Sequence, residues 1–165
     1  MRSIPNRAQR TLLVAILIGW AGAARASHYA VADVPRIITP AQVEKLHKAK
    51  IETTEQLFDR AAKSKDRKAL AKATGLSAGD LLGLARRCDL LRIKGVGSEM
   101  VLLLEAAGVK TTVDLTAAAP AALTSAMESA NRTAKISDKP PTEPQLADWI
   151  AQAKQLSQAQ VVESK

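Results

Sequence analysis

The chain repeats part of itself after 58 residues, and this repeat constrains the fold more than any other feature of the sequence. ITPAQVEKLHKAKIETTEQLF (the first copy, 38–58) aligns without a gap on VGSEMVLLLEAAGVKTTVDLT (the second copy, 96–116). The identical pairs are Val43 and Val101, Leu46 and Leu104, Ala49 and Ala107, Thr53 and Thr111, Thr54 and Thr112, and Leu57 and Leu115. These are positions that face a core or cap a helix. Each copy is therefore predicted to be a hairpin turn, a helix, a short connection and a second, capped helix.

Helix start and stop signals are dense along the chain, whereas strand signals are nearly absent. Pro40 follows Thr39 and suits the first position of a helix, and Thr53 with Gln56 forms a capping-box pattern. Gly75 and later Gly108 and Pro120 act as further stops or starts. The sequence thus predicts an all-α fold, a compact bundle of about eight short helices containing two helix-hairpin-helix-like repeats, the first of them degenerate.

Outside the two copies, helices are predicted from about Arg67, from about Ala78 and over PAALTSAMESANR. The stretch ISDKPPTEP is expected to be a proline-rich linker. The final helix carries an apolar face at helical spacing. Trp149 on that face is expected to fix the helix to the core. The face consists of Leu146, Trp149, Ile150 and Ala153.

The N-terminus has the pattern of an export signal. Arg2, Arg7 and Arg10 precede an apolar run that is too short to span a bilayer, and Ala24-Arg25-Ala26 resembles a cleavage site. We therefore expect a cleaved signal over 1–26, a flexible segment over 27–37, a helical domain over 38–157 and a frayed tail over 158–165. The protein would be exported, to the periplasm, with no membrane attachment after cleavage.

Basic residues concentrate in the middle of the chain. The formal net charge is +8, but removal of 1–26 would leave +4 because four arginines lie there. Such a basic centre favours acidic partners, although solvated helix faces would give the same pattern. The candidate basic patch consists of Lys63, Lys65, Arg67, Lys68, Arg86, Arg87 and Arg92.

The stretch LRIKGVGSEM in the second copy is the strongest candidate site. Two glycines flanking one apolar residue permit a tight turn, and the amides that follow open a helix, where an anion is favoured. The turn geometry alone could also require both glycines. In the first copy the equivalent turn has no glycine, and Pro40 removes an amide donor. The candidate phosphate-binding residues are Lys94, Gly95, Val96, Gly97 and Ser98.

The chain resembles a bacterial family labelled domain of unknown function 4332. The resemblance rests on DRKALAKATGLSAGDLLGLARRCDLLRIKGVGSEMVLLLEAAGVKTTVDL and on the later ANR and PPTEPQLADWIAQAKQL. It implies a helical fold built on helix-hairpin-helix elements and no particular activity. Helix-hairpin-helix proteins at large mostly bind nucleic-acid backbones, and some are protein-interaction modules.

Catalysis is not expected from this sequence. Cys88 is the only cysteine and is expected to be a buried small hydrophobe, while His28 and His47 are too far apart for a metal site. No nucleophile–base spacing or nucleotide-binding loop is present, so no cofactor or small-molecule substrate is expected. The apolar stretch 100–104 should form a helix that is centrally buried or that covers a partner.

Two functions remain. The first is an exported, non-enzymatic helix-hairpin-helix module that binds another protein or itself. The alternative is sequence-independent binding of duplex DNA, or another polyanion, through Lys94–Ser98 and the basic centre. Basic residues gathered on the hairpin face would favour DNA, whereas an open apolar patch would favour a protein partner.

Overall fold

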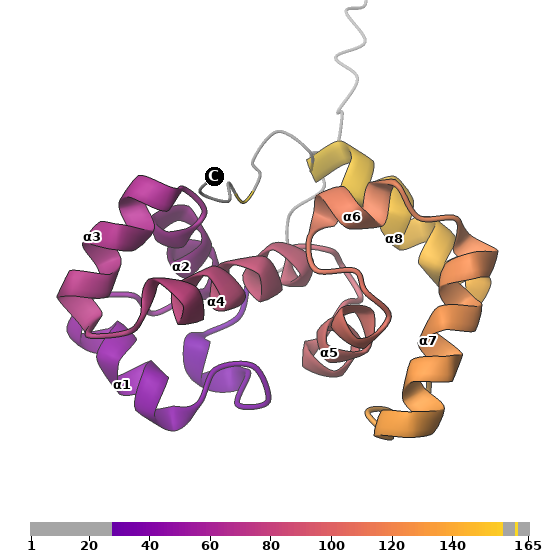
Figure 1. Ribbon diagram of the computed structural model, residues 1–165, viewed down its shortest axis with the longest axis horizontal. Coiled ribbons are helices and arrows are strands. Elements are labelled where there is room, and N and C mark those ends of the chain that lie inside the picture. The colour runs from indigo at the N-terminus through magenta and orange to yellow at the C-terminus, as the bar shows by residue number, and fades with distance from the viewer. Residues whose placement is uncertain (1–27, 157–160, 162–165) are drawn as a thin grey trace, which may run out of the picture.

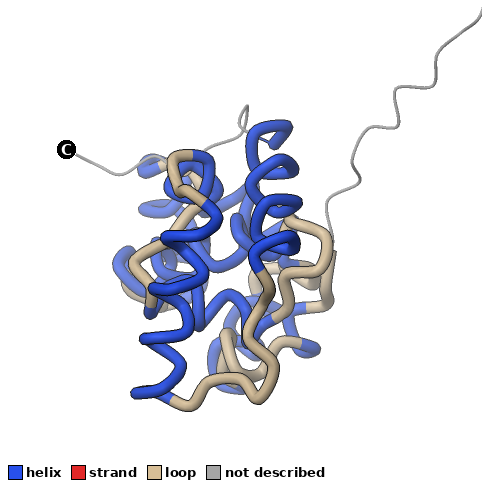
Figure 2. The backbone as a smooth tube through the Cα atoms, turned by 90° about the vertical axis from the view of Figure 1, so that its right-hand side faces the viewer, coloured by secondary structure: helices blue, strands red, loops and turns tan. Residues whose placement is uncertain are grey.

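Helices make up the whole regular structure of the described residues, 28–156 and Val161, in the computed structural model of the chain (Figures 1 and 2). The prediction of an all-α fold is confirmed. The predicted signal and most of the tail lie outside the described residues. The elements are η1 (Val31–Asp33), α1 (Pro40–Lys48), α2 (Thr54–Ala61), α3 (Ser64–Thr74), α4 (Ala78–Leu91), α5 (Ser98–Ala106), α6 (Thr112–Thr116), α7 (Pro120–Ala134) and α8 (Glu143–Leu156).

The helix boundaries follow the capping residues in the sequence. Thr39, Thr53 and Thr111 each form a full capping box at the start of α1, α2 and α6. Gly75 ends α3 in the left-handed conformation, with φ of 68°. Two helices begin earlier than the sequence predicts. Helix α3 begins at Ser64, one turn before Arg67, and α8 begins at Glu143, within the stretch expected to be linker. Proline is tolerated in a first helical turn, so Pro144 does not prevent that earlier start.

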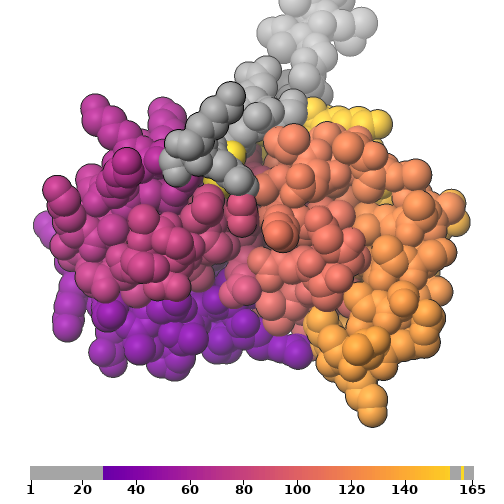
Figure 3. Space-filling view, in the orientation of Figure 1, coloured from indigo at the N-terminus to yellow at the C-terminus, as the bar shows by residue number. Residues whose placement is uncertain are grey.

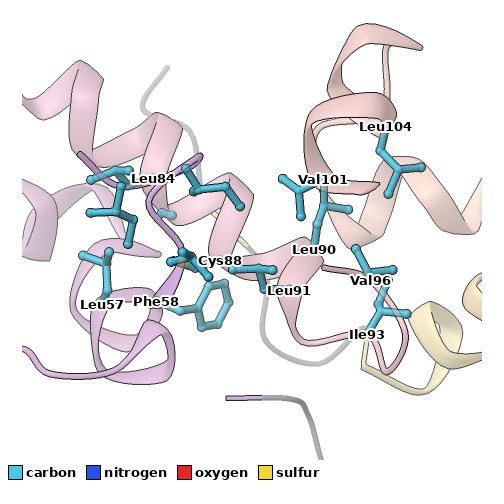
Figure 4. Close-up of a cluster of buried hydrophobic side chains, with 14 of the residues drawn as sticks. Leu57, Phe58, Leu84, Cys88, Leu90, Leu91, Ile93, Val96, Val101 and Leu104 are labelled. Atoms are coloured by element: carbon cyan, nitrogen blue, oxygen red, sulfur yellow. The ribbon is translucent and has the colours of Figure 1, made fainter. Parts of the chain in front are cut away.

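Helix α4 is the central helix of the fold and packs against helices on both sides. In Figure 1 it runs across the middle, with α1, α2 and α3 on one side and α5 to α8 on the other. Figure 4 shows how it serves both sides: Leu84 and Cys88 face Leu57 and Phe58 of α2, whereas Leu90 lies towards the second copy. The residues around Leu90 in that view are Ile93, Val96, Val101 and Leu104.

The two sequence copies have matching element bounds. α1 and α5 are each nine residues long and start 58 positions apart, and α2 and α6 start at the same offset. The connections also match, since the Ile51 amide donates to the Leu46 carbonyl at 3.0 Å and the Val109 amide to the Leu104 carbonyl at 2.9 Å. Both connections pass through a positive φ, 60° at Lys50 and 91° at Gly108.

Residues 28–37, for which the sequence predicts a flexible segment, contact the core through three apolar side chains. Val31, Val34 and Ile37 are buried, at a spacing of three residues. The Val31 amide donates to the Glu52 carbonyl at 2.9 Å, and Ala30 forms an antiparallel bridge with Thr53. The apolar spacing and this bridge place the segment over the connection between α1 and α2.

The final helix and the apolar helix α5 are both part of the core. All four residues of the apolar face of α8 are buried, including Trp149 at 4% exposure, so the predicted role of that face is confirmed. In α5, Val101, Leu103 and Leu104 are buried while Met100 and Leu102 are half-buried. The expectation of central burial for this helix is therefore met over most of its surface.

Candidate binding surfaces: the hairpin and the basic helix

The hairpin of the second copy joins α4 to α5. Val96 is fully buried beneath it, and its amide donates to the Ile93 carbonyl at 3.1 Å. Gly95 has a positive φ of 91°, which lets the chain reverse. Lys94 is exposed at the tip. The structure thus brings the five predicted phosphate-binding residues together in one short turn.

Helix α8 covers one side of this turn. The Gln152 side chain forms two hydrogen bonds with one residue of the hairpin: Oε1 accepts from the Lys94 amide at 2.8 Å, and Nε2 donates to the Lys94 carbonyl at 3.2 Å. The same Nε2 also donates to Asp148 at 2.8 Å. The Lys94 backbone is therefore already paired within the protein and has no free amide to offer an anion.

The two glycines of the hairpin have different roles. A Cβ built on Gly95 would lie 3.2 Å from Nε1 of Trp149, and its φ is positive, so the fold requires glycine there. Gly97 has extended backbone angles, φ −93° and ψ −178°, and a Cβ at that position would meet nothing within 4 Å. The fold therefore requires the first glycine and not the second.

The N-terminus of α5 is bordered by a paired carboxylate. No side chain among the described residues caps this helix, whose N-cap is Gly97. Glu99 in the first turn is paired with the Arg36 guanidinium and accepts from the Ser137 hydroxyl at 3.1 Å. The Arg36 guanidinium offsets the negative charge of Glu99, so this ion pair leaves little net charge beside these amides.

Three arginines of the predicted basic patch, namely Arg67, Arg87 and Arg92, form hydrogen bonds within the protein. The first two connect neighbouring helices. Arg67 is only 3% exposed, and its Nη1 donates to the carbonyls of Ala61 and Ala62 at the end of α2, both at 2.7 Å. Arg87 donates from Nε to both carboxylate oxygens of Glu105, at 2.9 and 3.1 Å. These contacts join helices to one another, so the two charges do not contribute to an open basic surface.

Arg92 belongs to a buried polar cluster. Its Nη1 donates to Oδ1 of the fully buried Asp89 at 2.8 Å, and its guanidinium lies 4.7 Å from the centroid of the Phe58 ring. Oδ2 of Asp89 accepts from both the amide and the hydroxyl of Thr112, each at 2.8 Å. Asp89 therefore anchors the start of α6 to the end of α4.

The lysines of the predicted patch lie on α3 and at its N-cap. Lys65 and Lys68 are exposed and, together with Lys72, which is outside the predicted patch, follow helical spacing along one face. The opposite face buries Arg67, Leu70 and Thr74. Lys63 is exposed at the N-cap. In Figures 1 and 3 this helix lies at one outer edge of the molecule, separated from α5 by the length of α4. The structure thus places the exposed lysines away from the hairpin, and Arg86 stays half-buried on α4.

Across 28–156 and Val161, no group of three or more His, Cys, Asp or Glu residues is arranged to hold a metal ion. Burial raises the pKa of the Cys88 thiol to about 12, with Asp89 adding to the shift, so the thiol stays protonated at physiological pH. In the same part of the chain, no helix has the length and apolarity needed to cross a membrane.

Sequence reasoning missed two residues that shape these surfaces. Asp89 is fully buried between Arg87 and Arg92 of the predicted basic patch, and the signal for it was an acid placed three residues before Arg92. Gln152 closes the hairpin from 58 residues away, and no local pattern indicates that contact.

The chain belongs to the family described as Domain of unknown function (DUF4332), whose sequence pattern matches residues 36–156. That match covers α1 to α8 and the last residues of the N-terminal segment. No curated protein matches the chain, and no solved structure does.

Proposed function

We propose that this protein is an exported, non-enzymatic binding module of helix-hairpin-helix type, and that its partner is an acidic protein surface bound by the outer face of α3. The observation that carries the proposal is the exposed lysine face of α3, formed by Lys65, Lys68 and Lys72. Clustered charge of one sign on one helix face steers a partner of the opposite sign.

The supporting geometry gives this face a rigid foundation. Leu70 and Thr74 pack inward, and the Arg67 guanidinium ties α3 to the end of α2 through two carbonyls. The lysines therefore project from a helix whose orientation is fixed before a partner arrives. A preorganised surface loses less conformational entropy on binding than a flexible one does.

Duplex DNA is the second candidate partner, and one observation favours it. Gly97 is not required by the fold, and a bare backbone at the start of a helix allows a phosphate to approach closely. Against it stands the Lys94 backbone, which is paired with Gln152. The lysines of α3 also lie away from this turn (Figure 1). The balance of contacts therefore favours the protein partner.

Fluorescence anisotropy with two labelled probes tests the proposal: a polyglutamate peptide of about 15 residues and a random-sequence duplex of about 20 base pairs, each at about 50 and 200 mM salt. We expect the peptide to bind the wild type at the lower salt. The triple variant Lys65→Glu, Lys68→Glu and Lys72→Glu should lose this binding.

Lys94→Glu is the matched control, because it reverses an exposed charge at the hairpin and leaves α3 unchanged. It should retain peptide binding. If the duplex binds more tightly than the peptide, and Lys94→Glu weakens duplex binding while the α3 triple variant does not, the hairpin is the site and the DNA candidate is correct.

A further inference from the structure

The first copy is closed by an extended segment that runs along the connection between its helices. Ala30 pairs with Thr53 in an antiparallel bridge, and the Val31 amide donates to the Glu52 carbonyl at 2.9 Å. The His28 imidazole lies 3.5 Å from the Glu55 carboxylate. Residues 28–31 thus bind along 52–55, and the fully buried Val31 fills the space beneath.

The equivalent edge of the second copy is an open groove of about 440 Å³. The counterparts of Glu52, Thr53 and Glu55, after a shift of 58 residues, are Lys110, Thr111 and Val113, and all three line this groove. The other contributors are Gly108, Asp114 and Arg86 of α4. The two copies therefore present the same edge, one closed by an N-terminal segment and one open.

The groove has features that suit an extended aliphatic segment. Among the described residues, Val113 is the only exposed large hydrophobic side chain, at 39% exposure. The Lys110 carbonyl, the counterpart of the Glu52 carbonyl, accepts no backbone hydrogen bond from the described part of the chain. Arg86 and Lys110 bring positive charge to the lining of the groove, and Asp114 brings one negative charge.

The chain places one aliphatic residue of its own in this groove. Val161 lines it, is half-buried and packs against the hydrophobic core. Helix α8, which packs on α6, ends at Leu156, so only a few residues connect it to the groove. An extended chain advances at most roughly 3.3–3.6 Å per residue, so Val161 must lie close to the end of α8 at Leu156.

We propose that this groove is a docking site for an extended aliphatic segment, and that the chain's own C-terminal segment occupies it through Val161 in the free protein. The sequence of that segment, SQAQVVESK, adds one carboxylate at Glu163, which complements Arg86 and Lys110. The proposal uses no residue of the α3 face and stands independently of the acidic partner proposed for α3.

Amide NMR spectra of the full-length chain test the proposal. In Val161→Asp, a charged group would replace the half-buried aliphatic contact, so we expect the resonances of Gly108, Lys110, Thr111 and Val113 to move. Val161→Ile keeps the contact and should leave them near their wild-type positions. Ala151→Asp, which adds the same charge at an exposed position of α8, should not affect the groove.

Adding the peptide SQAQVVESK to full-length Val161→Asp is the second arm. The peptide should return the groove resonances towards wild-type positions in a saturable way, and SQAQDVESK should not. Unchanged groove resonances in Val161→Asp, or no response to the wild-type peptide, would overturn the proposal. Groove resonances of the wild type that change on dilution would show that a second copy supplies Val161, and the own-chain assignment would then be wrong.

Discussion

The two copies share their helices and differ in what closes them. At the start of the second helix of each copy stands a buried threonine. In the first copy, the Thr54 amide donates to the Tyr29 carbonyl at 2.9 Å and its hydroxyl accepts from the Tyr29 amide at 3.1 Å. In the second, the amide and hydroxyl of Thr112 both donate to the Asp89 carboxylate. The threonine of the first copy thus pairs with a neutral peptide group, whereas that of the second copy pairs with a buried carboxylate.

A repeated sequence can therefore determine the same local structure in both copies while the groups that pair with it differ. The caps and the apolar positions decide the shape of each unit. The group that pairs with the buried threonine determines which edge of the unit remains exposed to solvent. The Tyr29 segment covers the edge of the first copy, whereas Asp89 binds Thr112 from within and leaves the edge beside Val113 exposed.

Removing the buried charge should produce the largest effect. Asp89→Ala leaves the Arg92 guanidinium and the Thr112 amide without this carboxylate, and loss of one partner of a buried ion pair costs about 3–5 kcal/mol. We expect the free energy of unfolding, measured by urea denaturation, to fall by that amount. Asp80→Ala, which removes an exposed acid from the same helix, should cost far less. Equal losses in the two variants would contradict a special role for Asp89.

The two hairpin glycines should respond differently to one added methyl group. Gly95→Ala introduces a Cβ against Trp149 at a positive φ and should destabilise the fold by about 2 kcal/mol. Gly97→Ala meets no contact within 4 Å and should change stability by less than about 0.5 kcal/mol. Thermal and urea unfolding of both variants check this, and a large loss in Gly97→Ala would show that the turn requires both glycines.

Replacing Thr54 or Thr112 by valine measures how much each threonine hydroxyl contributes to stability. Thr112→Val removes a hydroxyl donor to a carboxylate and should cost about 2 kcal/mol, whereas Thr54→Val removes an acceptor for a neutral amide and should cost about 1 kcal/mol. The difference in urea midpoints between the two variants is the quantity to measure. If Thr54→Val loses more stability than Thr112→Val, the hydrogen bond to the Asp89 carboxylate is not the stronger of the two.

The left-handed residues in the two connections should respond with opposite signs. Lys50 carries a positive φ of 60°, which glycine adopts without a steric penalty, so Lys50→Gly should stabilise the protein by up to about 1 kcal/mol. Gly108→Ala places a Cβ at a φ of 91° and should destabilise it by about 1 kcal/mol or more. Changes of the same sign in the Tm of the two variants would show that the positive φ does not determine which residue is preferred in these turns.

The smallest expected effect concerns the cap that only one copy has. Thr39 caps α1, whereas Gly97 at the equivalent position of α5 offers no side chain. Gly97→Ser should therefore stabilise the fold by a few tenths of a kcal/mol. Differential scanning calorimetry should resolve a small rise in Tm, and a fall would mean that the backbone at Gly97 cannot present a capping side chain to α5.

Much of the fold could be predicted because its determinants are local. Capping threonines, left-handed turns and apolar spacing depend on neighbours within a few residues, and the predictions for Thr53 and Trp149 were confirmed on that basis. The contact of residues 28–37 with the rest of the fold could not be predicted locally, because it includes a bridge from Ala30 to the distant Thr53.

The candidate site was harder to predict because a run of charge does not show which side chains point inward. Arg67 lies on the same helical face as Leu70 and Thr74, and that periodicity would have separated it from the lysines beside it. Periodicity cannot show that Gln152 pairs with the Lys94 backbone, since that contact depends on how α8 packs.

Chemical-shift mapping of the wild-type protein with the polyglutamate peptide and with the duplex is the most direct test of the functional account. We expect the peptide to move the amide resonances of α3 around Lys65, Lys68 and Lys72, and the duplex to leave those of Gly97, Ser98 and Glu99 in place. Duplex-induced shifts that are largest at Gly97 to Glu99, with α3 unaffected by the peptide, would contradict it and make the hairpin the binding site.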